Sequence, residues 1–526
     1  MNRRHFLMST GAAAMLQGAE EKTRLGLVRS THARLRQPAP LDQELSDAQV
    51  REMVFRAIEL GSPGAGSLEA KIRPGSWLVI KPNIVFLRPH PAYAKGDITD
   101  FRVTRAVLEY VATRSRASRI TIAEGGTYRR PNDKAEDNVV TQGGQRVNAL
   151  NFDWGVDEFP GFDGSLGGMI QSFARRFPDK KFDYVDLSYD AVRDPGGAFR
   201  RIEAPKAPNG VGAFGDRPDY FVTNTITKCD FLITVPVMKV HLQSGITACL
   251  KNYVGTAPRE AYSRPGVFHN AKLHEQHSAG GRIDPFIVDL ASFHPPDYCV
   301  VDGLRGLQCQ EHSIQRDDQT VRSNLILAGE DPVAADAITA RLLGFQETDM
   351  EFLHMASRRQ MGTMDMARID VRGDEPDRDN RRWEKPGNWY GRCNRLWKIA
   401  RGPEWVAHEA RFDTLDLPQA TGIAPAAGVT YKVAAQAHSP GHGRGHLWMG
   451  LRGKVVARLN GLTVAEFECG TRYRVGQFQF PVTLQPGTNR FEFHIQPLAG
   501  QAMLSVLVTG RRNDGDTLER LRWAAV

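Results

Sequence analysis

The sequence predicts an α/β fold with a largely parallel sheet core and a long insertion, followed by a C-terminal β-sandwich of jelly-roll-like type. In the first 350 residues, short apolar runs of strand length alternate with amphipathic helical segments. From about residue 420 onward, only short alternating strands separated by turn residues are found. A chain of 526 residues is also long enough for more than one domain.

The α/β part is defined by apolar runs that end at a proline, a glycine or a polar residue. Strands are expected at 24–28, 76–80, 119–123, 229–235, 298–302 and 323–328. Helices are expected at 47–60, 104–112 and 332–343, where apolar residues recur at helical spacing. Pro332 and Gly344 favour the start and the end of the last of these helices.

Changes in composition divide the chain into segments. An α/β domain is predicted over 21–360, in which the Gly-, Asp-, Phe- and Arg-rich stretch 126–220 is interpreted as an insertion or lid. Residues 361–419, rich in charge and tryptophan, are interpreted as a connector, and 513–526 as a tail. The β-sandwich is predicted over 420–512. Its strands are expected at 430–434, 447–451, 454–459, 463–468, 477–482, 489–495 and 502–508.

The amino terminus has the features of an export signal. Arg3 and Arg4 are followed by Phe6 and a short, weakly apolar run that ends near Leu16. This order is typical of a twin-arginine signal peptide, so residues 1–20 are predicted to direct the protein through the twin-arginine export machinery to the periplasm or beyond. The alternative is a frayed basic start of a cytoplasmic protein. No apolar run reaches about 18 residues, so no stable membrane span is expected.

Charge and cysteine content exclude several classes of protein. The net charge is +8, but the basic residues are interspersed with acidic ones, so no nucleic acid is expected as a partner. The six cysteines lack a C-x-x-C spacing, so there is no iron–sulfur cysteine motif. If one disulfide forms after export, Cys299 and Cys309 are the closest pair in the sequence.

Three lysines follow predicted strands, and sites in α/β proteins form at the carboxyl ends of strands. They are Lys81, Lys239 and Lys251. Lysines that converge on one cleft would bind phosphate, sulfate or carboxylate, or stabilise an enolate. Repulsion among them would lower a lysine pKa and suit a general base. The alternative is three separate surface lysines.

Acidic and amide side chains accompany these lysines. The candidates for a divalent metal or an acid–base pair are Asp100, Glu124, Asp302 and His241. Helix capping or loop anchoring is the alternative role for the acids. Asn83 and Asn252 are expected to orient a substrate, and Gly125 permits close approach of the backbone.

Eight motifs occur in a fixed order along the α/β part. They are L-V-I-K-P-N (78–83), I-T-D-F-R-V-T (98–104), I-A-E-G-G (122–126), C-D-F-L-I-T-V-P-V-M-K-V-H (229–241), C-L-K-N-Y-V-G (249–255), I-V-D-L (287–290), V-V-D-G-L (300–304) and A-G-E-D-P-V-A-A-D-A-I-T-A-R-L-L-G-F (328–345). Together they resemble the bacterial family filed as domain of unknown function 362, over about residues 24–350. The resemblance implies a fold region and a set of site residues but no settled reaction. Some members carry ferredoxin-like cysteine runs, which this chain lacks, so an electron-transfer role is not carried over.

These observations predict an exported enzyme that acts on a small anionic or sugar-like hydroxylated molecule, with metal assistance left open. The expected catalytic residues are Lys239, His241, Lys81 and Glu124, and the expected substrate-binding residues are Asn83, Lys251, Asn252 and Gly125. The alternative is a non-catalytic periplasmic ligand-binding or scaffold protein, with a redox partner as a weaker third reading. Lys239→Met should abolish turnover and cost no more than about 1 kcal/mol of stability, because changes at the surface usually have small effects.

Overall fold

The computed structural model describes residues 22–84, 96–125, 139–142, 145–148, 158, 162–241, 243–263, 270–278, 283–309, 317–345, 347, 350–376, 383–385, 392–393, 396–410, 414–426, 428–470, 478–498, 502–510 and 521–524. The predicted signal peptide at 1–20 lies outside these residues. Within them, no helix has both the length and the apolar character needed to cross a membrane.

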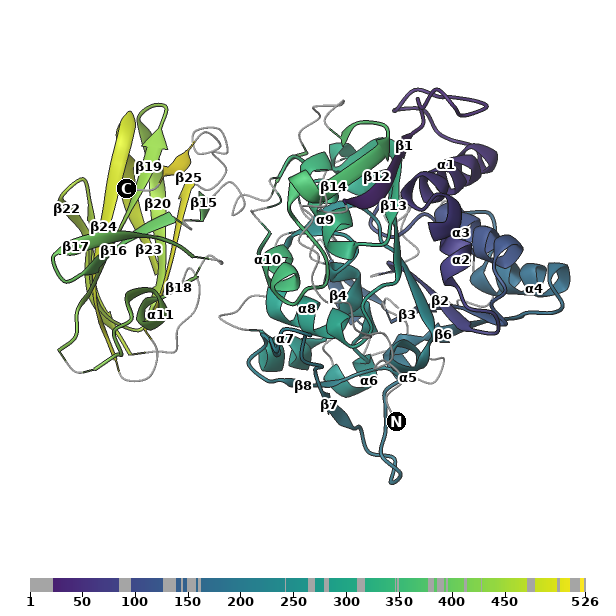
Figure 1. Cartoon of the computed structure of the whole chain (residues 1–526), viewed down its shortest axis with the longest axis horizontal. Coiled ribbons are helices and arrows are strands. Elements are labelled where there is room, and N and C mark those ends of the chain that lie inside the picture. The colour runs from purple at the N-terminus through teal and green to yellow at the C-terminus, as the bar shows by residue number, and fades with distance from the viewer. Residues whose placement is uncertain are drawn as a thin grey trace, which may run out of the picture.

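The described chain up to Gly373 is organised around an eight-stranded sheet, in the order β14-β1-β13-β12-β9-β2-β3-β6 (Figure 1). Its strands are β1 (Thr23–Arg29), β2 (Trp77–Pro82), β3 (Arg119–Glu124), β6 (Lys181–Asp186), β9 (Phe231–Val235), β12 (Tyr298–Leu307), β13 (Thr320–Gly329) and β14 (Ile369–Gly373). From β12 to β6 all neighbours are parallel, whereas β13 is antiparallel to both β12 and β1. The predicted α/β class with a parallel core is confirmed, and the sheet as a whole is mixed.

Helices cover both faces of this sheet, which explains why its central strands read as continuous apolar runs. The main helices are α1 (Asp47–Gly61), α3 (Phe101–Arg114), α4 (Leu166–Arg176), α8 (Asp284–Ser292), α9 (Pro332–Leu342) and α10 (Glu351–Arg358). Leu78 and Ile80 of β2 pack in one core with α1, α3 and α4. Val79 points to the other face and packs in the core that holds α8, α9 and α10 (Figure 1).

Shorter elements connect these layers. They are α2 (Leu68–Lys71), β4 (Val139–Gln142), β5 (Gln145–Asn148), β7 (Arg201–Glu203), β8 (Asp219–Phe221), α5 (Asn224–Lys228), β10 (Lys239–His241), β11 (Gly245–Thr247), the 3-10 helix η5 (Lys251–Thr256), α6 (Arg259–Tyr262) and α7 (Ala271–His277). The hairpin of β10 and β11 and the helix η5 follow β9, so they lie near the carboxyl ends of the parallel strands.

The structure differs from the predicted insertion over 126–220. Helix α4 joins the helical layer on one face, and β6 extends the sheet by pairing with β3 from Arg119↔Lys181 to Glu124↔Asp186. The sequence K-F-D-Y-V-D of β6 alternates polar and apolar residues because β6 is the last strand of the sheet and has a partner on one side only. An edge strand therefore lacks the apolar run on which the prediction depended.

The last part of the described chain forms two antiparallel sheets. One contains β15 (Arg392–Cys393), β18 (Thr414–Asp416), β20 (Gly443–Leu451), β23 (Phe478–Leu484) and β25 (Met503–Gly510). The other contains β16 (Leu396–Arg401), β17 (Glu404–Glu409), β19 (Tyr431–Ser439), β21 (Gly453–Leu459), β22 (Leu462–Cys469), β24 (Gly487–Pro497) and β26 (Arg522–Ala524), and the short helix α11 (Leu417–Thr421) precedes β19. Residues of both sheets share one hydrophobic core, in which Leu447 and Val506 meet Val433 and Phe493.

The range predicted as a connector, 361–419, contributes strands to both parts of the fold. Strand β14 pairs in parallel with β1 in the eight-stranded sheet. Strands β16 and β17 form a hairpin that pairs with β19 in the seven-stranded sheet. Among the tryptophans of this range, Trp397 is a core residue of these later sheets, where its ring contacts Phe493 edge to face, whereas Trp405 is exposed.

Gly26 allows β1 to approach helix α1, and we expect Gly26→Ala to destabilise the fold. A Cβ atom at residue 26 would lie 2.1 Å from the Ala57 carbonyl oxygen and 2.6 Å from the Gly61 nitrogen. Helix backbone cannot move aside easily, so the expected loss is about 1–3 kcal/mol of unfolding free energy, measured by urea denaturation. Gly66→Ala is the control, because no atom lies within 4 Å of a Cβ there. Equal stability of the two variants would contradict this close packing.

Candidate active site at the carboxyl ends of the parallel strands

Lys81 and Glu124 meet at the carboxyl ends of the neighbouring parallel strands β2 and β3. The Lys81 Nζ atom and the Glu124 Oε2 atom form an ion pair. Their side chains are 0% and 1% exposed, respectively. Since both strands end at the same edge of the sheet, residues 43 positions apart in the sequence contact each other. The structure therefore brings two of the predicted catalytic residues together.

Burial changes the proton affinity of both groups. Loss of hydration lowers the pKa of Lys81, although the neighbouring carboxylate opposes that change. The same loss of hydration raises the pKa of Glu124, against the attraction of Lys81 and hydrogen bonds from the backbone N–H groups of Ile84 and Gly125. The lowered lysine pKa thus comes from burial and not from the predicted repulsion between lysines. Opposite shifts bring the two pKa values closer, which favours transfer of a proton at this position.

Asn252 connects the pair to the strands around it. Its Oδ1 atom accepts hydrogen bonds from Lys81 Nζ at 3.0 Å and Asn83 Nδ2 at 3.1 Å. Its Nδ2 group donates to the Lys81 carbonyl at 3.0 Å and to Thr234 Oγ1 at 2.9 Å. With these four contacts, the orientation of the Asn252 amide is fixed, and it holds the ammonium group of Lys81 in place.

Asn83 carries an acceptor that the described chain leaves without a partner. Its side chain is 4% exposed, and its Oδ1 atom has no hydrogen bond within the described residues. Most buried polar atoms in folded proteins are hydrogen-bonded, and an orphaned one costs stability. A donor group on a bound molecule would satisfy this atom next to Lys81 and Asn252.

Two glycines let the backbone pass directly over the ion pair. A Cβ atom at Gly255 would lie 2.7 Å from either oxygen of the Glu124 carboxylate and 2.9 Å from Lys81 Nζ. A Cβ atom at Gly125 would lie 2.3 Å from the Gly255 carbonyl oxygen. Gly125 therefore has the predicted role of permitting close backbone approach. Gly255 was not predicted, although it stands at the end of the motif C-L-K-N-Y-V-G.

The segment that carries Asn252 is anchored by a buried carboxylate. Asp336 of α9 accepts hydrogen bonds from the backbone N–H groups of Cys249 at 2.6 Å and Leu250 at 2.9 Å. Burial raises the pKa of Asp336 to about 7, although these hydrogen bonds oppose the change. Lys251, the third predicted lysine, is 8% exposed on η5, directly before Asn252.

Lys239 pairs with a different carboxylate. It is 0% exposed, and its Nζ donates to Asp97 Oδ1 at 2.8 Å and to the Asp97 carbonyl at 2.6 Å. The loop that holds Asp97 also contacts Asn83 of the candidate site, because Thr99 Oγ1 accepts from the Asn83 N–H at 2.8 Å. The assumption that Lys239 lies at the surface was wrong. Asp97 was missed because nothing in its local sequence distinguishes it from a turn residue.

His241 follows Lys239 on β10 and is 9% exposed. Its Nδ1 atom accepts hydrogen bonds from the backbone N–H groups of Gln243 at 3.0 Å and Ser244 at 3.1 Å. Since two donors point at Nδ1, the neutral ring carries its proton on Nε2. These two backbone hydrogen bonds fix the orientation of the His241 ring.

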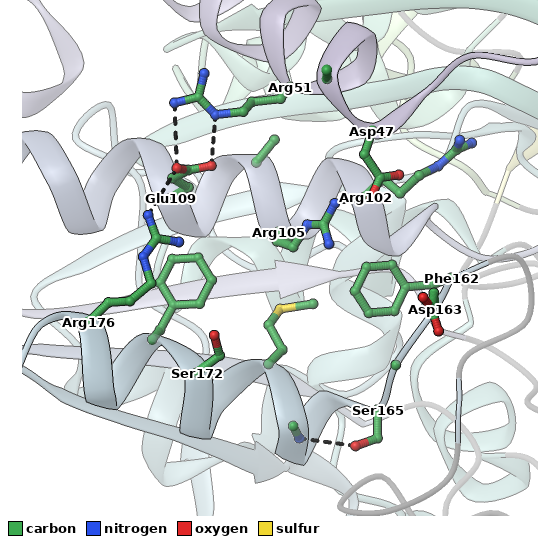
Figure 2. Close-up of a pocket in the computed structure, with 16 residues that line it drawn as sticks. Asp47, Arg51, Arg102, Arg105, Glu109, Phe162, Asp163, Ser165, Ser172 and Arg176 are labelled. Atoms are coloured by element: carbon green, nitrogen blue, oxygen red, sulfur yellow. Dashed lines mark hydrogen bonds and ion pairs between the residues drawn. The ribbon is translucent and has the colours of Figure 1, made fainter.

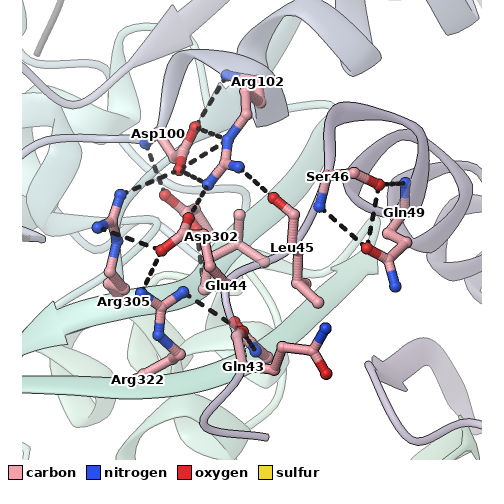
Figure 3. Close-up of polar contacts among 12 residues, drawn as sticks. Gln43, Glu44, Leu45, Ser46, Gln49, Asp100, Arg102, Asp302, Arg305 and Arg322 are labelled. Carbon is pink, nitrogen blue, oxygen red and sulfur yellow. Dashed lines mark hydrogen bonds and ion pairs between the residues drawn. The ribbon is translucent and has the colours of Figure 1, made fainter. Parts of the chain in front are cut away.

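Asp100 and Asp302 are neighbours within a group of arginines (Figure 3). The Asp100 N–H donates to Asp302 Oδ2 at 2.7 Å, and the Asp100 carboxylate pairs with Arg102 at 2.6 Å. Asp100 also has the helix-capping role considered for it, because it accepts from the Arg102 N–H at the start of α3. Burial, with the charge of Asp100 adding to it, raises the pKa of Asp302 to about 7.

The four predicted metal ligands are occupied with different partners. Glu124 pairs with Lys81, and His241 accepts hydrogen bonds from the backbone of the turn that follows it. Asp100 and Asp302 contact each other and the neighbouring arginines. Among the described residues, no group of three or more His, Cys, Asp or Glu side chains is arranged to hold a metal ion. Metal binding therefore stays a prediction. No disulfide joins Cys299 and Cys309 in the described part of the chain.

The fold and the buried lysine–carboxylate centre define an α/β protein with a polar site at one edge of a mostly parallel sheet. Residues 205–341 match the model of a family described as "Domain of unknown function (DUF362)". The matched range holds Lys239, Lys251, Asn252 and Asp302, and it supports the family resemblance for this part of the chain. The search of curated proteins found no match.

Solved structures with local similarity are distant. The lactate racemase apoprotein from Thermoanaerobacterium thermosaccharolyticum is 13% identical over 53% of this chain and 52% of that chain, with a TM-score of 0.25. A family 35 carbohydrate binding module from an environmental isolate is 14% identical over 20% of this chain and 77% of that chain, with a TM-score of 0.16. A GH2 beta-galacturonidase from Eisenbergiella tayi is 13% identical over 22% of this chain and 23% of that chain, with a TM-score of 0.17. None of these similarities carries an argument about activity.

Proposed function

We propose that this chain is an exported enzyme that moves a proton on a small anionic or hydroxylated substrate at the Lys81–Glu124 centre. The observation that carries the proposal is the fully buried ion pair, whose members have pKa values shifted toward each other. Perturbed pKa values of this kind are typical of acid–base catalysts.

Each residue of the centre has a role that follows from its contacts. An anionic group of the substrate replaces Glu124 as the partner of Lys81, and the freed Glu124 carboxylate then accepts a proton from the substrate. Asn252 keeps Lys81 in position, and the Asn83 Oδ1 atom accepts a hydrogen bond from a substrate hydroxyl. Isomerisation and elimination both begin with such a proton transfer, whereas in hydrolysis Glu124 would accept the proton of the attacking water.

The proposal extends to parts of the chain beyond this centre. It includes export through a twin-arginine signal at 1–20, a resemblance to domain of unknown function 362 over the whole range 24–350, and a jelly-roll-like module near the carboxyl terminus. Modules of this kind accompany glycan-active enzymes, which favours a sugar-derived substrate.

The test is proton exchange with solvent, because it needs no knowledge of the product. The full chain is incubated in D₂O with uronic acids, sugar phosphates and hydroxy acids, and deuterium incorporation is followed by NMR. Glu124→Gln should reduce incorporation by a factor of about 10²–10⁴. Glu404→Gln, at an exposed position of β17, is the matched control and should keep the full rate. Saturable binding without exchange or turnover would replace this proposal by the alternative of a ligand-binding protein.

A further inference from the structure

A polar pocket lies outside the candidate active site, between the helices α1, α3 and α4 (Figure 2). Its volume is about 410 Å³, within the usual range for sites that bind small molecules. Apolar side chains form part of its wall, chiefly Phe162, Met169 and Phe173. Neither Lys81 nor Glu124 lines it, so the pocket is separate from the proposed catalytic centre.

Arginines from three helices line this pocket: Arg51 of α1, Arg105 of α3 and Arg176 of α4. Arg51 Nε donates to Glu109 Oε2 at 2.8 Å, and Arg176 Nη2 donates to Glu109 Oε1 at 3.2 Å (Figure 2). Two guanidinium groups therefore share one carboxylate. Burial alone would raise the pKa of Glu109, but the two arginines outweigh it and hold that pKa below its usual value. Arg51, Arg176 and the ionised Glu109 together therefore carry one net positive charge.

Aromatic rings hold all three guanidinium groups in place, and Arg51 lies 4.2 Å from the centre of the Phe55 ring. Arg176 lies 5.1 Å from the centre of the Phe173 ring, and Arg105 lies 5.2 Å from that of Phe162. Each guanidinium has five N–H donors in a planar fork that matches a carboxylate. Arg51 and Arg176 are 48% and 49% exposed, so donors of both groups are accessible to a molecule in the pocket.

We propose that this pocket binds a small organic monocarboxylate. Its carboxylate lies between Arg51 and Arg176 and competes with Glu109, while its apolar body packs against Phe162, Met169 and Phe173. A single net positive charge matches a monoanion better than a phosphate dianion. The apolar wall distinguishes this ligand from the hydroxylated substrate of the active site, and the inference does not rest on the proposed function.

Titration calorimetry of the full chain with phenylacetate tests the proposal. We expect one binding site per chain with a dissociation constant on the order of 1 mM or tighter. Arg51→Gln/Arg176→Gln should weaken binding by more than about tenfold, because both donors are lost. Glu109→Gln should tighten binding by about tenfold, since the competing carboxylate is removed. Arg34→Gln, at an exposed position away from the pocket, should leave binding unchanged.

Two probes and a folding control make the outcome decisive. Phenylacetamide has the same shape without the charge and should not bind, whereas inorganic phosphate should bind more weakly than phenylacetate. Circular dichroism measures whether each variant is folded. If the double variant Arg51→Gln/Arg176→Gln does not fold, the single variant Arg176→Gln takes its place in the binding measurement. Absence of saturable phenylacetate binding to both the native chain and Glu109→Gln would overturn the proposal. So would unchanged affinity in the folded arginine variant.

Discussion

The Lys239→Met variant is expected to lose about 3–5 kcal/mol of unfolding free energy. Lys239 and Asp97 are both 0% exposed, with Nζ 2.8 Å from Oδ1. Methionine fills much of the space of lysine but removes the cation that pairs with the buried Asp97 carboxylate. Removal of one partner of a buried ion pair is far more costly than removal of a surface charge. Urea denaturation followed by circular dichroism measures the loss.

A double variant separates the charge effect from packing. In Asp97→Asn/Lys239→Met neither buried side chain is charged, so most of the lost stability should return. Lys181→Met is the surface control, because the Lys181 side chain is 65% exposed, and it should change stability by less than about 0.5 kcal/mol. A loss below about 1 kcal/mol in Lys239→Met alone would restore the expectation derived from the sequence.

Strands buried on both faces were predictable, because burial demands an unbroken apolar run. The strands β2, β3, β9 and β13 all lie within a few residues of their predicted positions. The seven strands predicted after residue 420 were found from a different signal, short alternating runs separated by turn residues, and they also lie within a few residues of their predicted positions. The two edge strands of the eight-stranded sheet lack such an apolar run and were not predicted. Strands β6 and β14 stand at the two ends of the eight-stranded sheet, and polar residues alternate with apolar ones in both.

The position of the candidate site was predictable, but its pairings were not. The rule that sites lie at the carboxyl ends of parallel strands selected Lys81, Glu124, Asn83 and Asn252, which contact one another in the structure. That rule does not say which acid each lysine meets. Partners such as Lys239 and Asp97 are 142 positions apart, and only the folded loops bring them together. Burial likewise depends on the tertiary fold. The sequence around Lys239 therefore did not indicate that its side chain is buried.

The Lys81→Met variant is expected to show a stability loss that depends strongly on pH. At pH 8 the loss should be about 3–5 kcal/mol, because Glu124 remains as a buried charge without its cation. Burial already raises the pKa of Glu124 above its ordinary value of 4.5, and loss of Lys81 removes the main attraction that opposes this shift. In the folded variant, Glu124 therefore binds its proton more tightly than in the unfolded chain.

The direction of the pH dependence follows from that raised pKa. A carboxyl group with a raised folded-state pKa contributes full stability only below its unfolded pKa, and the contribution is lost as the pH rises through the folded value. The difference between native protein and Lys81→Met should thus be small near pH 4.5 and should grow toward pH 8. Lys81→Met/Glu124→Gln, with no buried charge at the centre, should lose this pH dependence. Urea midpoints and slopes measured across this range give the comparison. An equal loss at pH 4.5 and pH 8 would mean that packing, and not the charge of Glu124, determines the role of Lys81.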